Sequence, residues 1–393
     1  MLRRTLLKGA AGVAMTMALT AGAWAQEVVK IGLILPMTGP SASTGRQVEA
    51  AAKLYIAQNG AKVAGKTIEL IVKDDTGVAD VTKRLAQELV VNDKVSVLAG
   101  FGLTPLALAA APIATQAKVP LVVTSAATSI ITEASPFIVR TSFTLPQVTV
   151  PIADWAAKNG IKKVVSLVTD YGPGIDAEKA FKEKFEAAGG KVIETLRAPL
   201  RNAEFAPFLQ KAKDAAPDAL FLFVPSGQGA SLMKQVAERE FAKAGIKVIA
   251  TGDVTDDDQI NGMGDAVLGM ITSHYYSAAH PSPENKVYVA AFKKANNGLR
   301  PNFMSVGGYD GMHLIYKALE KTGGDANGQK LVDAMKGMSW TSPRGVISID
   351  PETRDIVQDV YIRKVEKVDG ELYNVEFASV PKVVDPVKAA RKK

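Results

Sequence analysis

Cysteine is absent from this sequence of 393 residues, which excludes disulfide bonds, a thiol nucleophile and thiolate metal ligands. The three histidines, His274, His280 and His313, are far apart in sequence and lack the spacing of a metal site. No serine lies in a nucleophile elbow, and no complete glycine-rich dinucleotide motif occurs. We therefore predict a protein that is not an enzyme, with no catalytic residue, no cofactor and no metal.

The net charge of +7 is spread along the chain and forms no basic stripe with interleaved aromatic residues, so we expect no nucleic-acid partner. An acidic run, Asp256-Asp257-Asp258, has the composition of a divalent-metal site. Three adjacent acids before an amphipathic helix more often mark a favourably charged helix N-terminus, and we adopt that interpretation.

The N-terminus has the features of an export signal. Arg3, Arg4 and Lys8 are followed by a short apolar run at 10–19 and by Ala23-Trp24-Ala25, a small-x-small cleavage site. We predict a signal peptide over residues 1–25, with the mature chain beginning near residue 26. The paired arginines resemble a twin-arginine signal, although an ordinary secretory signal can look the same. Because the sequence has no cysteine to carry it, we expect no lipid anchor.

The segment from Val95 to Thr128 has the pattern strand, loop, helix, strand, loop. Two short apolar runs, 95–99 and 121–124, are typical of strands buried on both faces of a parallel sheet. Between them, Thr104 followed by Pro105 indicates a helix start, with the threonine as a cap for the free amides.

The loops 100–104 and 125–128 follow these two strands. Because a parallel crossover is right-handed almost without exception, both loops are expected at the same edge of the sheet. Their small residues and hydroxyl groups, next to a helix N-terminus, suit a bound carboxylate. Each residue taken alone also fits an ordinary loop, so the prediction depends on the two loops lying together.

Strands and helices alternate along most of the remaining chain, which is typical of α/β proteins. One series runs over residues 28–140 and a second over 144–273, so we expect two similar lobes, each built on a parallel sheet. Later helices at 284–295 and 305–321, and strands at 345–349 and 359–365, indicate further crossings between the lobes.

Several motifs recur in the order and spacing of one known family. They are VVKIGLILPMTG at 28–39, the loops 100–104 and 125–128, Asp170-Tyr171-Gly172, Gly264-Asp265-Ala266, Ser282-Pro283-Glu284-Asn285 and Tyr309-Asp310-Gly311. Each motif is loose alone, but together they resemble the periplasmic leucine/isoleucine/valine-binding proteins of ABC importers. The resemblance covers essentially the whole mature chain.

The resemblance implies two Rossmann-like lobes with parallel sheets joined by three crossovers, the type I periplasmic-binding fold or Venus flytrap. We predict lobe I over 26–143 and 276–350, lobe II over 144–275 and 351–393, and crossovers near 140–144, 274–277 and 348–355.

The resemblance also implies a function and partners. The protein is expected in the periplasm, as a monomer that captures a small carboxylate-bearing ligand by lobe closure. It would deliver the ligand to an ABC permease in the inner membrane with its ATPase subunits. The same fold can instead present ligand to a membrane receptor, so a sensing subunit is an alternative.

The residues that match the family's ligand site come from both lobes. Thr104, Ala126 and Thr128 match the positions that hold the ligand carboxylate, and Tyr171 matches a tyrosine that closes over the ligand. The full implied set is Thr44, Gly102, Leu103, Thr104, Ala126, Ala127, Thr128, Tyr171, Ser226, Gly227 and Asp253. Thr44 stands where many relatives carry an aromatic residue, which implies a wider pocket.

One departure from the family concerns the ligand class. Gly252 stands where amino-acid binders carry an acid for the ligand ammonium, and Asp253 follows it. If Asp253 reaches the cleft, the site still admits a branched-chain or other hydrophobic amino acid, which is the class that the resemblance favours. If Asp253 caps a helix and points away, the ligand is an aromatic or aliphatic acid without an α-ammonium.

Overall fold

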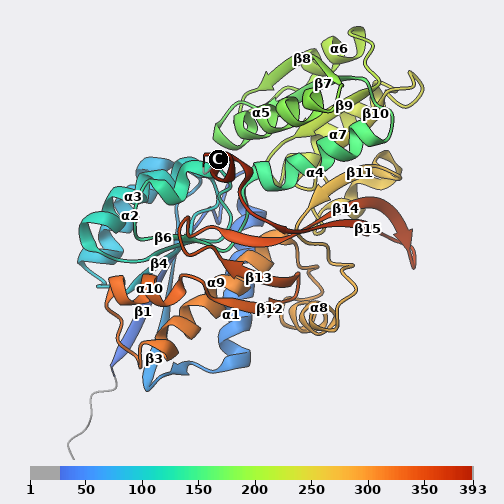
Figure 1. Cartoon of the computed structure of the whole chain (residues 1–393). Helices are drawn as coiled ribbons and strands as arrows, with labels where there is room; N and C mark the ends of the chain where they lie inside the picture. The colour runs from blue at the N-terminus through green and yellow to red at the C-terminus, as the bar shows by residue number, and fades with distance from the viewer. Residues whose placement is uncertain (1–26, 392–393) are drawn as a thin grey trace, which may run out of the picture.

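The computed structural model describes residues 27–391, which form two α/β lobes (Figure 1). The predicted signal peptide lies outside the described residues. Two mixed sheets organise the described chain, one of six strands and one of nine. None of the helices within residues 27–391 is long and apolar enough to cross a membrane.

The six-stranded sheet is the core of the first lobe. Its centre is β1, which pairs in parallel with β3 and with β4, and only the short β2 runs antiparallel. In spatial order the strands are β2 (Lys62–Val63), β3 (Lys66–Asp74), β1 (Val28–Leu35), β4 (Val97–Gly100), β5 (Leu121–Val123) and β6 (Ile138–Arg140). The apolar runs of β1, β4 and β5 are buried almost throughout, as expected for strands covered on both faces.

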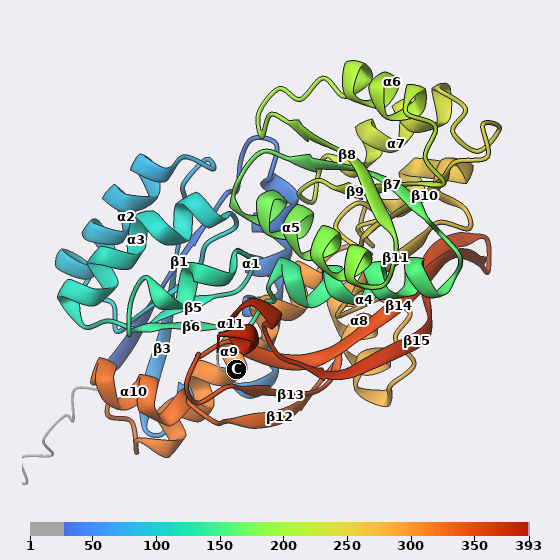
Figure 2. The same cartoon turned by 45° about the horizontal axis from the view of Figure 1, so that its top comes forward.

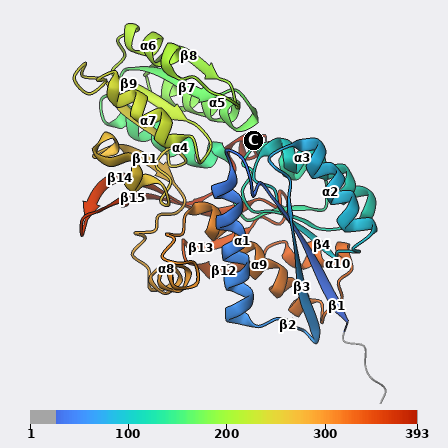
Figure 3. The same cartoon turned by 180° about the vertical axis from the view of Figure 1, so that it is seen from behind.

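Helices cover both faces of this sheet (Figure 3). On one side α2 (Ala79–Val91) packs beside α3 (Thr104–Ala117), and on the other α1 (Ala42–Asn59) packs along α9 (Phe303–Lys321). The helix α10 (Gly328–Met335) packs on α9, and the 3-10 helix η1 (Ser129–Glu133) follows β5. The first lobe is therefore completed by residues that follow the second lobe in sequence.

The nine-stranded sheet belongs to the second lobe and extends beyond it. Its strands, in spatial order, are β12 (Ser339–Ser342), β13 (Gly345–Ile349), β14 (Ile356–Val368), β11 (Ile271–His274), β10 (Lys247–Thr251), β9 (Ala219–Phe223), β7 (Lys163–Thr169) and β8 (Lys191–Ala198), with β15 (Glu371–Val383) on β14. The strands β8, β7, β9, β10 and β11 pair with one another in parallel. The strand β14 pairs antiparallel with β11, and β12, β13 and β15 continue the sheet by antiparallel pairing. The parallel sheet predicted for the second lobe is therefore confirmed for β7 to β11, and the later strands extend it by antiparallel pairing.

The second sheet carries its own helices. They are α4 (Leu145–Lys158), α5 (Gly172–Ala187), α6 (Ala206–Asp214), α7 (Gly229–Glu238) and the 3-10 helix η2 (Ile260–Val267). The strand predicted over 267–273 begins only at Ile271, because residues 260–267 form η2. Two further helices are α8 (Pro283–Ala295) and α11 (Pro386–Ala390), the latter lying against α4 between the lobes (Figure 2).

The segments that join the lobes are held by buried charged side chains. Arg344, fully buried, donates to the carbonyl oxygens of Thr141 at 2.5 Å and Ser142 at 3.2 Å, and pairs with Asp310 at 2.8 Å. It thereby connects the crossing between β6 and α4 to α9. The exact lobe boundaries stay a prediction, since β13 and β14 pair directly across the proposed division at residue 350.

Candidate functional site

The loops after β4 and β5 lie side by side at one edge of the first sheet, as their order in the sequence predicts. The amide of Ala126 donates to the carbonyl oxygen of Phe101 at 3.0 Å, which joins the two loops. Gly100 has a φ of 109°, and a Cβ there would lie 2.3 Å from the carbonyl oxygen of Ile34. Only glycine fits this close approach, so the direction of the first loop depends on it.

Thr104 differs from its predicted role as a helix cap. It is the first residue of α3, Leu103 occupies the N-cap position, and no side chain caps the helix. The Thr104 hydroxyl instead forms a 2.8 Å hydrogen bond with the hydroxyl of Thr128. Both side chains are buried, so the pair links the two loops through their hydroxyl groups.

The second lobe contributes the opposite wall. Tyr171, which precedes α5, stacks on Phe223 of β9 with 6.1 Å between ring centroids. Burial, together with the nearby Asp253 carboxylate, raises the pKa of Tyr171 well above its usual value. Asp253 follows β10 and is 3% exposed, and its Oδ2 accepts a 2.9 Å hydrogen bond from Thr251 Oγ1. Asp253 does not cap a helix, because the N-cap of the following 3-10 helix is Gln259.

A small cavity of about 20 Å³ lies between these walls. Nine of the predicted site residues line it: Thr44, Gly102, Leu103, Thr104, Ala126, Ala127, Tyr171, Ser226 and Asp253. Two do not. Thr128 lies behind Thr104 as its hydrogen-bond partner, and Gly227 faces the loop of the other lobe, where a Cβ would lie 2.7 Å from the carbonyl oxygen of Pro40.

The remaining lining residues are mostly apolar: Ser125, Phe143, Leu145, Pro173, Phe223, Pro225 and Met304. Ser125 could have been predicted as a site residue from the sequence, because it belongs to the loop 125–128 predicted to bind the carboxylate. Its hydroxyl is buried and has no hydrogen-bond partner among residues 27–391, so it is available to a ligand. Phe143 comes from the crossing after β6 and Met304 from the start of α9, and no local pattern marked either as a site residue.

The lobes touch across the cavity, so the structure is a closed form. A Cβ on Gly172 at the start of α5 would lie only 2.6 Å from Thr128 Oγ1. Beside it, the amide of Ser129 donates to Asp176 Oδ2 at 2.9 Å. Arg201 donates to the carbonyl oxygen of Gly77 at 2.8 Å.

The acidic run 256–258 precedes the 3-10 helix η2, as predicted, but its carboxylates make contacts that connect the lobes. Asp256 accepts hydrogen bonds from Ser226 and from Asn302, the N-cap of α9, at 3.1 Å for the latter. Asp258 accepts from Ser43 at the start of α1. Burial and the neighbouring Asp258 raise the pKa of Asp256 well above its usual value. No cluster of metal-ligating side chains occurs within the described part of the chain.

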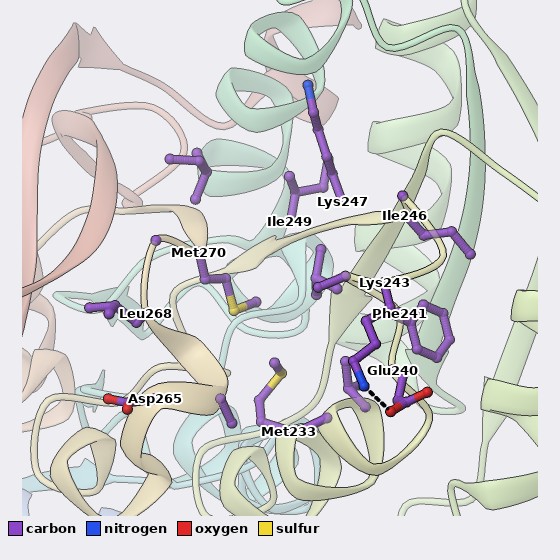
Figure 4. Close-up of a pocket in the computed structure, with 18 of the residues that line it drawn as sticks. Met233, Glu240, Phe241, Lys243, Ile246, Lys247, Ile249, Asp265, Leu268 and Met270 are labelled. Atoms are coloured by element: carbon purple, nitrogen blue, oxygen red, sulfur yellow. Dashed lines mark hydrogen bonds and ion pairs between the residues drawn. The ribbon is translucent and has the colours of Figure 1, made fainter.

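A larger groove of about 780 Å³ lies elsewhere on the second lobe, between the end of α7 and the first residues of β10 and β11 (Figure 4). Met233, Ile249 and Met270 contribute to its apolar wall, and Lys243 pairs with Glu240 at 2.5 Å. None of the predicted site residues lines this groove. Its size alone does not make it the site, because it lacks the convergent polar groups of the cavity between the lobes.

Comparison with known proteins places this geometry in context. A family model described as "Periplasmic binding protein" matches residues 28–371. A Leu/Ile/Val-binding protein homolog 6 from Brucella abortus is 45% identical over 372 residues, covering 94% of this chain and 95% of the relative.

Two solved structures are similar over nearly their whole length. A solute-binding protein of an ABC transporter from Rhodopseudomonas palustris BisB5, in complex with 3,4-dihydroxybenzoic acid, is 66% identical with a TM-score of 0.90, covering 92% of this chain and 99% of that one. Another from R. palustris HaA2, in complex with p-hydroxybenzoic acid, is 44% identical with a TM-score of 0.90, covering 93% and 100%.

Proposed function

The chain belongs to the periplasmic binding protein family, and we propose that it is the solute-binding protein of an ABC importer for hydroxylated aromatic carboxylic acids. It would act in the periplasm after removal of residues 1–25, and pass its ligand to a membrane permease with ATPase subunits. The observation that carries the ligand class is the lining of the closed cavity, which combines aromatic walls with polar groups contributed by both lobes.

The chemistry of the lining supports this class of ligand. The first lobe offers the hydroxyls of Thr104 and Ser125 beside the N-terminus of α3, where a carboxylate is favoured. The rings of Phe143, Tyr171 and Phe223 are among the lining residues and suit a flat apolar body. The structure that is 66% identical to this chain contains a dihydroxybenzoic acid.

The closed cavity explains how such a ligand would be held. Its volume of about 20 Å³ leaves room for roughly one water molecule and none for an aromatic ring. A ligand with a ring therefore enters only when the lobes separate, and closure then brings polar groups of both lobes against it. Binding that requires both lobes selects the closed conformation.

A hydrophobic amino acid is the second candidate ligand. The observation in its favour is that Asp253 lines the cavity, where a carboxylate can accept hydrogen bonds from an ammonium group. The relative with 45% identity is named for leucine, isoleucine and valine.

Isothermal titration calorimetry decides between the two classes. Purified mature protein, first unfolded and refolded to remove carried-over ligand, is titrated with 4-hydroxybenzoate, 3,4-dihydroxybenzoate, leucine and valine. The proposal expects the aromatic acids to bind at least tenfold more tightly than the amino acids. Binding of leucine or valine alone would replace the ligand class, and binding of none of the small acids would refute the transport function.

A further inference from the structure

We propose that Asp253 is the subsite for a ring hydroxyl of the ligand, and that His274, buried behind it, is a positioning residue that holds the Asp253 carboxylate toward the cavity. This inference rests on the proposed function and deepens it. It selects, among aromatic acids, those that carry a hydrogen-bond donor on the ring at the end away from the carboxylate.

One carboxylate oxygen of Asp253 accepts a hydrogen bond within the protein, and the other is available to accept one from a ligand. Thr251 Oγ1 donates to Oδ2 at 2.9 Å, and Nε2 of His274 lies 3.5 Å from the same oxygen. No hydrogen bond to Oδ1 is found among residues 27–391, although the side chain lines the cavity. Two contacts on Oδ2 therefore leave Oδ1 to accept a hydrogen bond from a ligand.

The backbone before Asp253 explains why the acid stands at this position. Gly252 occupies the family's usual acidic position, but a Cβ there would lie 1.8 Å from Nη2 of Arg363 and 2.7 Å from Cβ of His274. A side chain at residue 252 is therefore excluded by its neighbours. The acid on the following residue reaches the cavity instead, because the loop after β10 turns Asp253 into the lining.

His274 is a polar side chain in an apolar enclosure. It is fully buried, and neither ring nitrogen has a hydrogen-bond partner in the described part of the chain. The rings of Phe143, Tyr275 and Phe303 surround it, with centroids at 4.9, 4.6 and 4.3 Å. A buried polar group without a hydrogen bond destabilises the folded state, so its presence here calls for a functional explanation.

The geometry indicates that His274 holds the Asp253 carboxylate in its orientation toward the cavity. Burial lowers the pKa of His274 to about 4, so the ring is uncharged at neutral pH and carries one N–H donor. The 3.5 Å separation from Asp253 is longer than a normal hydrogen bond, so the contact can shorten when a ligand hydroxyl engages the carboxylate. His274 does not line the cavity and therefore acts only through Asp253.

The distribution of polar groups favours a ring hydroxyl over an ammonium. The carboxylate donors Thr104 and Ser125 belong to the first lobe, whereas Asp253 belongs to the second, and aromatic side chains line the space with them. In 4-hydroxybenzoate the carboxylate and the hydroxyl stand at opposite ends of a rigid ring. In an amino acid the carboxylate and ammonium are attached to one carbon, whereas a ring hydroxyl can engage Asp253 while the ring itself lies against the aromatic lining.

The test compares two ligands that differ by one hydroxyl. Calorimetric titration of the full mature protein with 4-hydroxybenzoate and with benzoate gives the ratio of their dissociation constants. In Asp253→Ala, the affinity for 4-hydroxybenzoate should fall about 10- to 100-fold, while the affinity for benzoate stays within about threefold. The matched control is Thr104→Val, which should weaken both ligands by the same factor and leave the ratio unchanged.

The positioning role has its own readout. His274→Phe should lower the same ratio by at least threefold without weakening benzoate, and His274→Gln, which retains an N–H donor, should restore part of it. If His274→Phe does not fold, His274→Leu, which also lacks an N–H donor, takes its place. An unchanged ratio in the folded variant without a donor overturns the role of His274.

The outcomes also separate this inference from the proposed function. Equal losses for both ligands in Asp253→Ala, or a wild-type protein that binds benzoate as tightly as 4-hydroxybenzoate, overturn the hydroxyl subsite and leave the aromatic-acid function intact. If the wild-type protein binds neither aromatic acid, the proposed function itself fails.

Discussion

Replacement of Gly172 by alanine should hinder lobe closure and weaken ligand binding. Gly172 is the first residue of α5 in the second lobe, and it packs directly on Thr128 of the first lobe. The added Cβ would lie 2.6 Å from Thr128 Oγ1 and 3.5 Å from Thr104 Cγ2. Thr128 cannot turn away freely, because its hydroxyl is hydrogen-bonded to Thr104 at 2.8 Å.

The magnitude follows from the cost of overpacking. Inserting a methyl group into a close-packed contact costs about 1–3 kcal/mol. Since Gly172 and Thr128 belong to different lobes, that cost applies to the closed form and is relieved when the lobes separate. At about 1.4 kcal/mol for each tenfold change, the dissociation constant of the ligand should rise roughly 5- to 150-fold.

Calorimetry with 3,4-dihydroxybenzoate measures this change, and thermal unfolding without ligand checks the fold. The unliganded Gly172→Ala protein should unfold within a few degrees of the wild type, because alanine is tolerated in a helix at least as well as glycine. Gly262→Ala is the control, since a Cβ at residue 262 meets no atom within 4 Å. Unchanged affinity in Gly172→Ala would refute the direct approach of the two lobes at this point.

Three further predictions address binding, motion and pH. Thr104→Val should weaken every carboxylate ligand about 10- to 100-fold by calorimetry, since a hydrogen bond to a charged group is lost; full affinity would mean that the site is misplaced. Small-angle scattering should show a smaller radius of gyration when ligand saturates the protein, and an identical profile would contradict lobe closure. Burial raises the pKa of Asp257 from 3.8 to about 6, so the folded state loses free energy of unfolding as the pH rises through that range. Burial lowers the pKa of His274 from 6.5 to about 4, so the folded state loses free energy of unfolding as the pH falls through that range. Asp257→Asn leaves the His274 effect unopposed, and its unfolding free energy in urea should fall between pH 6 and 4 by about 2 kcal/mol more than that of the wild type; parallel pH profiles would rule this out.

Much of the fold follows from local pattern. The apolar, β-branched run VVKIGLIL predicts a strand over residues 28–35, and β1 has those bounds. The proline after Thr104 likewise locates the start of α3 correctly, because the fixed φ of proline and its missing amide suit the first turn of a helix. Local steric rules of this kind need no information about the rest of the chain.

Strands whose partners lie far away in sequence were harder to predict. The sequence analysis did not predict β15. This strand pairs with β14 at the edge of the sheet and its C-terminal half is mostly exposed, so it lacks the continuous apolar run of a central strand. The antiparallel pairing of β11 with β14 is also invisible in the sequence, since β14 follows the return of the chain to the first lobe. Pairing of this kind depends on tertiary topology.

The candidate site divides in the same way. The sequence alone determined that two loops rich in hydroxyl and small residues would meet at one sheet edge, because strand order and crossover handedness are local consequences of the βαβ pattern. Only the tertiary structure decided that Asp253 faces the cavity, that Phe143 and Met304 line it, and that His274 lies behind it. These residues reach the site from separate segments through lobe packing, and contacts between distant segments leave no periodic signal in the sequence.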